Sequence, residues 1–441
     1  WPAAANGVVP GYMLANTDWQ KAVFQTGFTQ DYNLMYTQGS ENIHNAIGGG
    51  FLDQEGVIDG PKYKRATFRV NTDATYGILT IGENATFYYT EANPWQGGSF
   101  AGALQTPAVT PVYDESNVGG YGHGSSMFPH YITNPVGNQA AVDARNTSYR
   151  LVGNIFAELK FLKHFTYKFN MGLDAAWNRN KSLRHYWSLR TNDDTSHKDL
   201  LSEATSNRST FLIENTLTYN QSFDRHNITA LVGFTAEDVN WHSLGASIYD
   251  QQYDGLAQIT LGTTQNNMSG SDEQRRMASW LARVDYNYDS RYYLQVNFRS
   301  DACSKFGLAN RRGNFPSFSA GWRPTQEAFW EDLGASHIIN NIKLRGSWGK
   351  IGDMQSLGNY SYQSVVSSYQ PLIGLNNMWN WYGLLNDKII PGALATTRVN
   401  PNLKWETKTT TNVGIDFELL NSRLTGSFEW FTSTTSDLLY N

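Results

Sequence analysis

Hydrophobic and polar residues alternate along much of the chain, most regularly in residues 283–302. There the hydrophobic positions are Val284, Tyr286, Tyr288, Tyr292, Leu294, Val296 and Phe298. The positions between them are mostly polar, and the alternation is interrupted at Asp289 and Ser290. Successive side chains of a β-strand point to opposite faces of a sheet, so a period of two predicts strands. Two such runs joined by a short connection predict a β-hairpin.

The same pattern predicts about fourteen strands over the whole chain. They lie near residues 27–38, 42–52, 63–73, 79–91, 146–158, 164–177, 208–220, 226–238, 273–288, 291–301, 314–323, 341–349, 408–418 and 423–433. Several of these runs exceed ten residues, whereas the strands of globular sheets commonly have about five or six. The chain is therefore predicted to be all-β, with unusually long strands.

The connections between these strands alternate between short and long. The short ones are 39–41, 74–78, 159–163, 221–225, 289–290, 324–340 and 419–422, and the long ones are 53–62, 92–145, 178–207, 239–272, 302–313 and 350–407. The exception in the short series, 324–340, contains a stretch that could form a helical turn. Short turns at one end and long loops at the other are typical of outer-membrane barrels. The pattern thus predicts a transmembrane antiparallel up-and-down β-barrel with long external loops and short periplasmic turns.

A transmembrane barrel gives the two faces of each strand different surroundings. Every backbone amide in the bilayer needs a partner, and a closed barrel supplies one. The hydrophobic face is then expected to contact lipid and the polar face to line the lumen. The charged residues predicted to face the lumen are Arg283, Asp285, Arg299, Asp301, Lys343 and Arg345. They could bind a plug domain or a solute, or simply form a wetted wall.

Composition agrees with many polar loops and exposed strands. Charged residues make up 17% of the 441 residues, against about 25% in typical soluble proteins. Aromatic residues reach 14%, and the formal net charge of −5 gives no indication of a nucleic-acid partner. Cys303 is the only cysteine, so no disulfide can form within the chain, and this thiol is expected to be a small buried filler. No apolar run is long enough for a transmembrane helix.

The sequence contains no motif that indicates catalysis or a bound cofactor. It lacks H-E-x-x-H, G-x-S-x-G, a Walker A sequence and metal-binding Cys/His spacing. We therefore expect no enzyme activity, no metal and no cofactor. Trp379, Trp381 and Tyr382 lie in the longest predicted loop, where exposed aromatic rings could contact a solute or a lid protein. The alternative is that these rings hold the loop together.

Several stretches, in collinear order over nearly the whole chain, resemble the SusC-like (SusC/RagA) TonB-dependent transporters of the Bacteroidetes outer membrane. The most specific are the hairpin at 283–302, "RSDACSKFG" (299–307), "NFPSFSAGWR" (314–323), "KLRGSWGKIGD" (343–353), "NPNLKWETKTTTNVGIDFEL" (400–419) and "RLTGSFEWFTSTTSDLL" (423–439). Near the start, "TDWQKAVFQTG" (17–27) and "GGGFLDQEGVIDGPKYKRATFRVN" (48–71) resemble the segment that leads into the family's barrel and its next hairpin.

The resemblance implies a domain organisation for the chain. Members of this family have a barrel of about 22 strands preceded by a plug domain. Residues 1–26 are expected to lead into the barrel, and 27–441 to form part of it, with long loops 92–145, 178–207, 239–272 and 350–407. The plug and the C-terminal strands are expected to lie outside this chain.

The resemblance also implies a function, which is TonB-dependent import of oligosaccharides or oligopeptides across the bacterial outer membrane. The expected partners are a SusD-like surface lipoprotein, TonB–ExbB–ExbD acting through the plug, the lipid of the outer membrane and a glycan or peptide solute. A passive porin would have the same wall chemistry without a plug. A β-rich surface binding protein is the third alternative, and the alternation of loop lengths argues against it.

Overall fold

Fourteen strands of the chain form one sheet in a computed structural model that describes residues 15–95, 99–124, 132–190, 199–251, 256–334, 338–363, 366–368, 382–385, 388–391, 393–395, 400 and 402–439. They are β1 (Thr29–Gly39), β2 (Ile43–Glu55), β3 (Lys62–Tyr76), β4 (Leu79–Asn93), β5 (Val142–Phe161), β6 (Phe165–His185), β7 (Asp199–Phe223), β8 (His226–Gln251), β9 (Gly262–Tyr288), β10 (Tyr292–Cys303), β11 (Arg312–Trp322), β12 (Ile339–Asp353), β17 (Glu406–Leu419) and β18 (Leu424–Ser436). They follow one another in sequence order, and β12 pairs with β17.

The remaining elements are short. Two separate two-stranded sheets pair β13 (Val366–Ser368) with β16 (Ala393–Ala395) and β14 (Tyr382–Leu385) with β15 (Lys388–Pro391). The helices are α1 (Trp19–Val23), α2 (Ser99–Gln105), α3 (Pro135–Ala140) and α4 (Ala328–Asp332), with 3-10 turns η3 (Ile259–Leu261), η4 (Leu308–Asn310) and η5 (Pro324–Gln326). None of the helices described is long and apolar enough to cross a membrane.

The number and order of the predicted strands are confirmed, but all of the strands except β1 are longer than predicted, β5 to β9 most of all. β5 to β9 have 20 to 27 residues. The loops predicted at 178–207 and 239–272 are therefore wrong in extent, since only 186–198 and 252–261 lie between the strands there. The sequence prediction missed these extensions because Gly262–Glu273 is polar at nearly every position. Where both faces of a strand are wet, the hydrophobic alternation disappears while backbone pairing continues.

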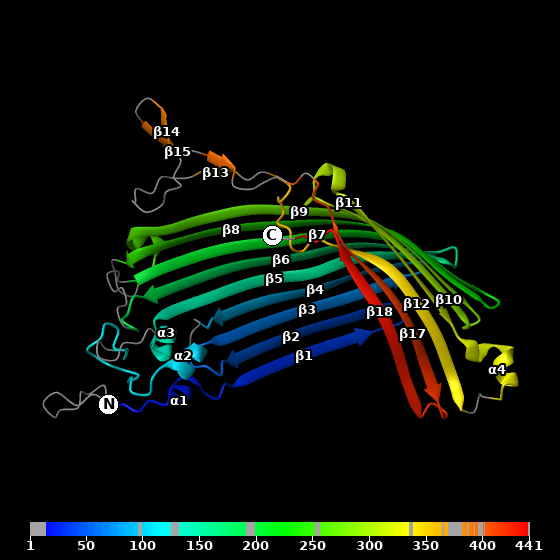
Figure 1. Ribbon diagram of the computed structural model, residues 1–441, viewed down its shortest axis with the longest axis horizontal. Coiled ribbons are helices and arrows are strands. Elements are labelled where there is room, and N and C mark those ends of the chain that lie inside the picture. The colour runs from blue at the N-terminus through cyan, green and yellow to red at the C-terminus, as the bar shows by residue number, and fades with distance from the viewer. Residues whose placement is uncertain are drawn as a thin grey trace. The chain divides into compact units, whose positions relative to one another are not determined.

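The chain divides into two compact units. The first contains the described residues up to Phe156, together with Gly172–Phe211 and Val239–Glu273. The second contains Ala157–Met171, Leu212–Asp238 and the chain from Gln274 onward. In the first unit β1 to β4 lie side by side and α1 to α3 gather near one end of these strands (Figure 1). In the second unit β10, β11, β12, β17 and β18 lie side by side (Figure 1).

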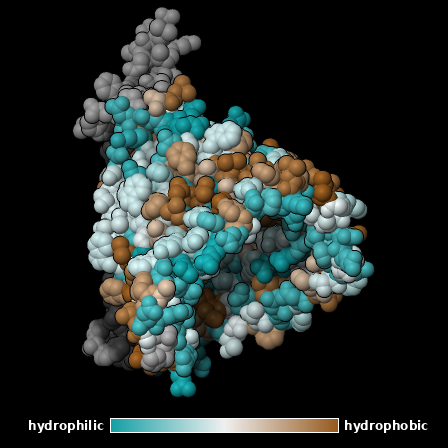
Figure 2. Space-filling model, turned by 90° about the vertical axis from the view of Figure 1, so that its right-hand side faces the viewer, coloured by the Kyte–Doolittle hydropathy of each residue, from teal (hydrophilic) through white to brown (hydrophobic). Residues whose placement is uncertain are grey.

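Exposed hydrophobic residues form rows across the strands of the second unit. Val284, Val296, Phe318 and Trp348 are cross-strand neighbours on β9 to β12, and the exposed fraction of each is between 39% and 45%. The next positions carry polar neighbours, such as Asn297 beside Ser317. Hydrophobic residues (brown) are exposed in patches on the face of the molecule that Figure 2 shows. A sheet that exposes its hydrophobic face is the reverse of a soluble protein's sheet.

The first unit has the same arrangement. Leu34, Gly49, Phe68 and Phe87 are cross-strand neighbours on β1 to β4. The three large side chains of this row are all exposed, and that of Leu34 most of all at 80%. An exposed hydrophobic row of this length indicates a surface that contacts something other than water.

The buried hydrophobic residues lie where loops fold over strand ends. In the second unit they form a cluster, which we call the loop core, consisting of Cys303, Phe306, Phe315, Leu357 and Trp405. Cys303 is fully buried there, so its prediction as a small filler is confirmed. The packing also explains a glycine, because a Cβ atom at Gly352 would lie 2.1 Å from Cζ of Phe315. In the first unit Trp19, Val23 and Ala103 form a second, smaller cluster.

The predicted helical turn between β11 and β12 is confirmed as η5 followed by α4. Glu327 joins the two and anchors them to the strands. Its carboxylate accepts hydrogen bonds from the hydroxyl of Tyr292 at 2.6 Å and from Nε1 of Trp322 at 3.1 Å. These hydrogen bonds, the Tyr292 bond first, hold the pKa of Glu327 below its ordinary value of 4.5.

This anchor predicts a pH dependence of stability. Because the pKa of Glu327 is lower in the folded protein, its contribution is complete above pH 4.5 and is lost as the pH falls through the folded value. We expect Glu327→Gln to remove this part of the acid destabilisation, measured as the unfolding midpoint of the detergent-solubilised protein between neutral and acidic pH. Glu331→Gln, on the exposed side of α4, is the control. An equal response of the two variants would contradict the assignment.

Candidate functional site

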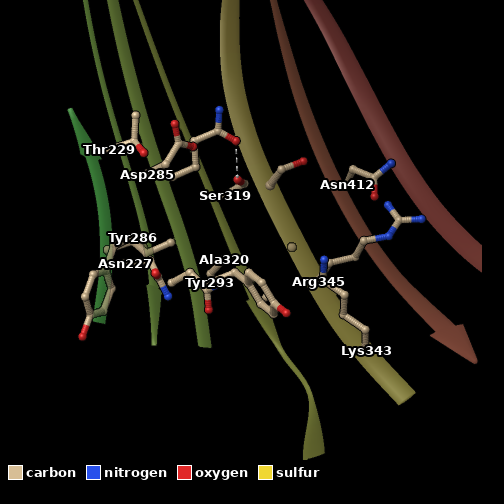
Figure 3. Close-up of a pocket in the computed structure, with 16 residues that line it drawn as sticks. Asn227, Thr229, Asp285, Tyr286, Tyr293, Ser319, Ala320, Lys343, Arg345 and Asn412 are labelled. Atoms are coloured by element: carbon tan, nitrogen blue, oxygen red, sulfur yellow. Dashed lines mark hydrogen bonds between the residues drawn. The ribbon is translucent and has the colours of Figure 1, made fainter. Parts of the chain in front are cut away.

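A groove on the polar face of the second unit gathers side chains from β8 to β12 and β17 (Figure 3). Its volume is about 460 Å³. The polar and aromatic side chains on this face that line it are Asn227, Thr229, Asp285, Asn287, Tyr293, Gln295, Ser319, Lys343, Arg345, Ser347 and Asn412. Every one of these residues belongs to the same compact unit.

The strand register builds the floor of the groove. One row of cross-strand neighbours runs through Asp285, Gln295, Ser319, Ser347 and Asn412. Neighbouring strands lie about 4.8 Å apart, so consecutive groups in this row are close enough to bind one molecule together. Ser319 donates to Gln295 at 3.5 Å, as the dashed line in Figure 3 marks. Hydroxyl and amide groups both donate and accept hydrogen bonds, which suits a polar, uncharged ligand surface.

Two cations lie at one end of this row. The ammonium of Lys343 lies 4.4 Å from the ring centroid of Tyr293, a cation–π contact. The guanidinium of Arg345 contacts Asp416, with Nε and Oδ2 3.2 Å apart, and also Glu429. No carboxylate lies within 4.0 Å of the Lys343 ammonium among the residues described. Lys343 therefore offers its charge to a ligand more readily than Arg345 does.

The structure brings the six predicted charged residues onto one face but only three into the groove. Those three are Asp285, Lys343 and Arg345. Arg283 pairs with Asp285 beside it, with Nε and Oδ2 2.5 Å apart. Arg299 and Asp301 form a separate pair farther along β10, 2.7 Å apart from Nε to Oδ1. That these residues face a lumen stays a prediction.

The neutral residues of the groove are not among the residues predicted from the sequence. Tyr293, Gln295 and Asn412 point to the same face of the sheet as the predicted charged residues. The alternation of side chains between the two faces of each strand was therefore the signal that could have identified them. Of the predicted loop aromatics, Trp379 and Trp381 lie outside the described residues. Tyr382 is the first residue of β14, where the structure describes only its backbone.

The described side chains form no group of three or more His, Cys, Asp or Glu that could hold a metal ion. Asp285, the acidic residue that lines the groove, is instead paired with Arg283. The arrangement is suited to binding polar molecules through charges, hydroxyls and amides.

Comparison with known proteins identifies the family. Residues 113–441, about three-quarters of the chain, match the family described as "TonB dependent receptor-like, beta-barrel". The chain belongs to this family. It is accordingly part of a bacterial outer-membrane protein, as the sequence resemblance predicted. The family is one of receptors and transporters, and its name describes no enzyme.

Two curated relatives align with almost the whole chain. TonB-dependent receptor P3 of Formosa agariphila is 27% identical over 97% of this chain, and TonB-dependent receptor SusC of Bacteroides thetaiotaomicron is 27% identical over 96%. The alignments cover 42% and 43% of those proteins. The chain thus spans less than half the length of the relatives it matches.

Solved structures share the fold. A structure of the RagAB peptide transporter superposes on 96% of this chain, and 46% of that chain, with a TM-score of 0.78 and 23% identity. The ferric citrate transporter FecA superposes on 92% of this chain and 48% of its own, with a TM-score of 0.53 and 9% identity. At these identities the likeness establishes the fold alone. The predicted outer-membrane barrel fold is therefore confirmed, with fourteen strands in the large sheet of the described residues.

Proposed function

We propose that the protein to which this chain contributes imports oligosaccharides or oligopeptides across the outer membrane, driven through TonB. The observation that carries this proposal is the match of residues 113–441 to the TonB-dependent receptor barrel. The division of the strands into an exposed hydrophobic face and a polar face supports it, because a barrel that conducts solutes needs a wet interior and a lipid-facing exterior.

A SusD-like surface lipoprotein is the proposed partner. The curated relative SusC and the structure titled as the RagAB peptide importer in its "open-open" state support this part of the proposal. In the proposed complex the lipoprotein covers the long loops, and Trp379, Trp381 and Tyr382 contact it or the solute. TonB–ExbB–ExbD acts through a plug domain, and this plug contacts the groove on the polar face.

Energy dependence is the experiment that tests the function. Cells carrying the whole protein are given fluorescently labelled oligosaccharides or oligopeptides, with and without a protonophore. We expect accumulation in the periplasm to fall to the level of cells that lack the protein when the proton-motive force is collapsed, and equally when TonB is deleted. Uptake that continues under both conditions would identify a passive porin, and labelling confined to the cell surface would identify a binding protein.

The groove leads to a prediction about transport. We expect Lys343→Ala to change the rate of uptake about fivefold, because one lost polar contact is worth roughly 1 kcal/mol. The matched control is Leu344→Ala at the next position of β12, where the side chain lies on the opposite, hydrophobic face. The amount of protein assembled in the outer membrane is measured alongside uptake for both. Equal uptake by wild type and Lys343→Ala would remove the groove from the transport path.

A further inference from the structure

The connection between β11 and β12 presents a small hydrophobic surface outside the sheet. It consists of Phe329 and Leu333, which are exposed, and of Trp330 beside them, which is half-buried with its indole nitrogen covered. Successive residues of an α-helix are about 100° apart, so these three lie on one side and Glu331 on the other. The exposed fractions of Phe329 and Leu333 are 46% and 67%. We call this surface the α4 patch.

The α4 patch is attached to the hydrophobic face of the strands. Glu327, directly before α4, holds the hydroxyl of Tyr292 and the indole nitrogen of Trp322. These two residues are cross-strand neighbours and are 45% and 36% exposed. Their rings face outward with the other hydrophobic residues while their polar atoms are hydrogen-bonded at the strand end. Tyrosine and tryptophan take this arrangement in the aromatic belts of membrane proteins.

The α4 patch lies beside the end of an exposed hydrophobic row, to which Glu327 links it. Tyr288, Tyr292, Trp322 and Leu344 form an unbroken cross-strand row at this end of β9 to β12. Because consecutive strands are antiparallel, α4 lies at the same end as the tight turn at Asp289 and Ser290. Short turns of outer-membrane barrels are periplasmic, and the membrane leaflet there consists of phospholipid.

We propose that α4 is an interfacial anchor whose patch inserts into the headgroup region of the periplasmic leaflet. Phe329 and Leu333 enter the boundary with the acyl chains, and Glu331 stays in water. Helices with one hydrophobic side bind membrane interfaces in this way, and their length does not decide it. The phospholipid is the occupant because Glu327, directly before the patch, is bonded to two residues of the exposed hydrophobic row that the barrel fold turns toward lipid. The proposal depends on the outer-membrane location of the protein and not on transport.

Depth-dependent fluorescence quenching tests the proposal. The native cysteines of the whole protein are first replaced, Cys303→Ala among them. Leu333→Cys is then introduced and labelled with bimane, and the protein is reconstituted into a phospholipid nanodisc. We expect lipid spin-labelled near the headgroup to quench the label at least twice as strongly as lipid labelled near the chain end, and iodide to quench it weakly. Glu331→Cys is the control on the opposite side of α4, where iodide is expected to quench. Val296→Cys reports the lipid-facing wall.

Two results would overturn the anchor. Quenching of the Leu333 label by iodide but not by lipid would place the patch in water. Protection from both quenchers would mean that protein covers it, from a second copy or another part of the same protein. Phe329→Cys repeats the measurement if Leu333→Cys fails to assemble. Lipid quenching of the Val296 label with none of the Leu333 label would refute the anchor alone. Absence of lipid quenching at both positions would refute the lipid-facing orientation of the strands.

Discussion

Val296→Arg is expected to destabilise the membrane-inserted protein by about 2–4 kcal/mol, the cost of a cation on the lipid face near the middle of a bilayer. The side chain of Val296 is 43% exposed and lies between Val284 and Phe318, both exposed and hydrophobic. An arginine placed there meets neither water nor a carboxylate. We expect less protein in the outer membrane and a lower urea midpoint in lipid vesicles.

The adjacent residue provides a matched control. Gln295→Arg introduces the same side chain on the other face, directly beside Asp285 on the neighbouring strand. We expect this variant to change stability by less than about 1 kcal/mol, the usual size of an exposed charge pair. If Gln295→Arg destabilised the protein as much as Val296→Arg, the two faces of β10 would not differ in their surroundings.

The second large effect is expected from Trp405→Ala in the loop core. The Trp405 ring is buried 4.8 Å from the ring of Phe306 and 5.4 Å from that of Phe315. Its Nε1 donates a hydrogen bond to the backbone carbonyl of Arg311 at 3.1 Å. Replacing a buried tryptophan by alanine costs about 3–5 kcal/mol because it removes contacts and leaves a cavity. The loop between β10 and β11 is therefore expected to open.

Hydrogen exchange measures this opening locally. A loss of about 3 kcal/mol corresponds to exchange roughly a hundredfold faster for amides protected by the loop core. The backbone amide of Ser304, which donates to the carbonyl of Arg276, is one of them. Trp348→Ala removes a tryptophan from the exposed hydrophobic face and serves as the control. Similar exchange at Ser304 in both variants would show that Trp405 does not hold the loop.

Most of the strands of the barrel wall can be predicted from the sequence because the bilayer requires hydrophobic side chains on one face of each strand. From Tyr292 to Phe298 in β10 every second side chain is hydrophobic and exposed, and the side chain after it faces the other way, as Leu294 and Gln295 illustrate. A membrane requires this arrangement along each strand that crosses it, so a single strand already carries the signal. The same signal located all fourteen strands of the sheet.

The features that the sequence did not predict depend on distant residues or on water. The polar extension of β9 at Gly262–Glu273 has no hydrophobic face, so only its pairing with a neighbour defines it as a strand. The groove depends on the strand register that places Ser347 beside Asn412. This register could not be predicted from the sequence because a long connection separates β12 from β17. The bond from Trp322 to Glu327 needed the geometry of a turn.

The most direct test of the central claim, that the hydrophobic face of the strands contacts lipid and the polar face does not, is a spin-label scan of residues 292–298. Single cysteines are introduced into the whole protein in lipid vesicles, and the collision rates of each label with oxygen and with a water-soluble nickel complex are measured. We predict that oxygen accessibility peaks at Tyr292, Leu294, Val296 and Phe298 and falls at the positions between them. Accessibility without a period of two, or with its oxygen maxima at Tyr293, Gln295 and Asn297, would contradict the account.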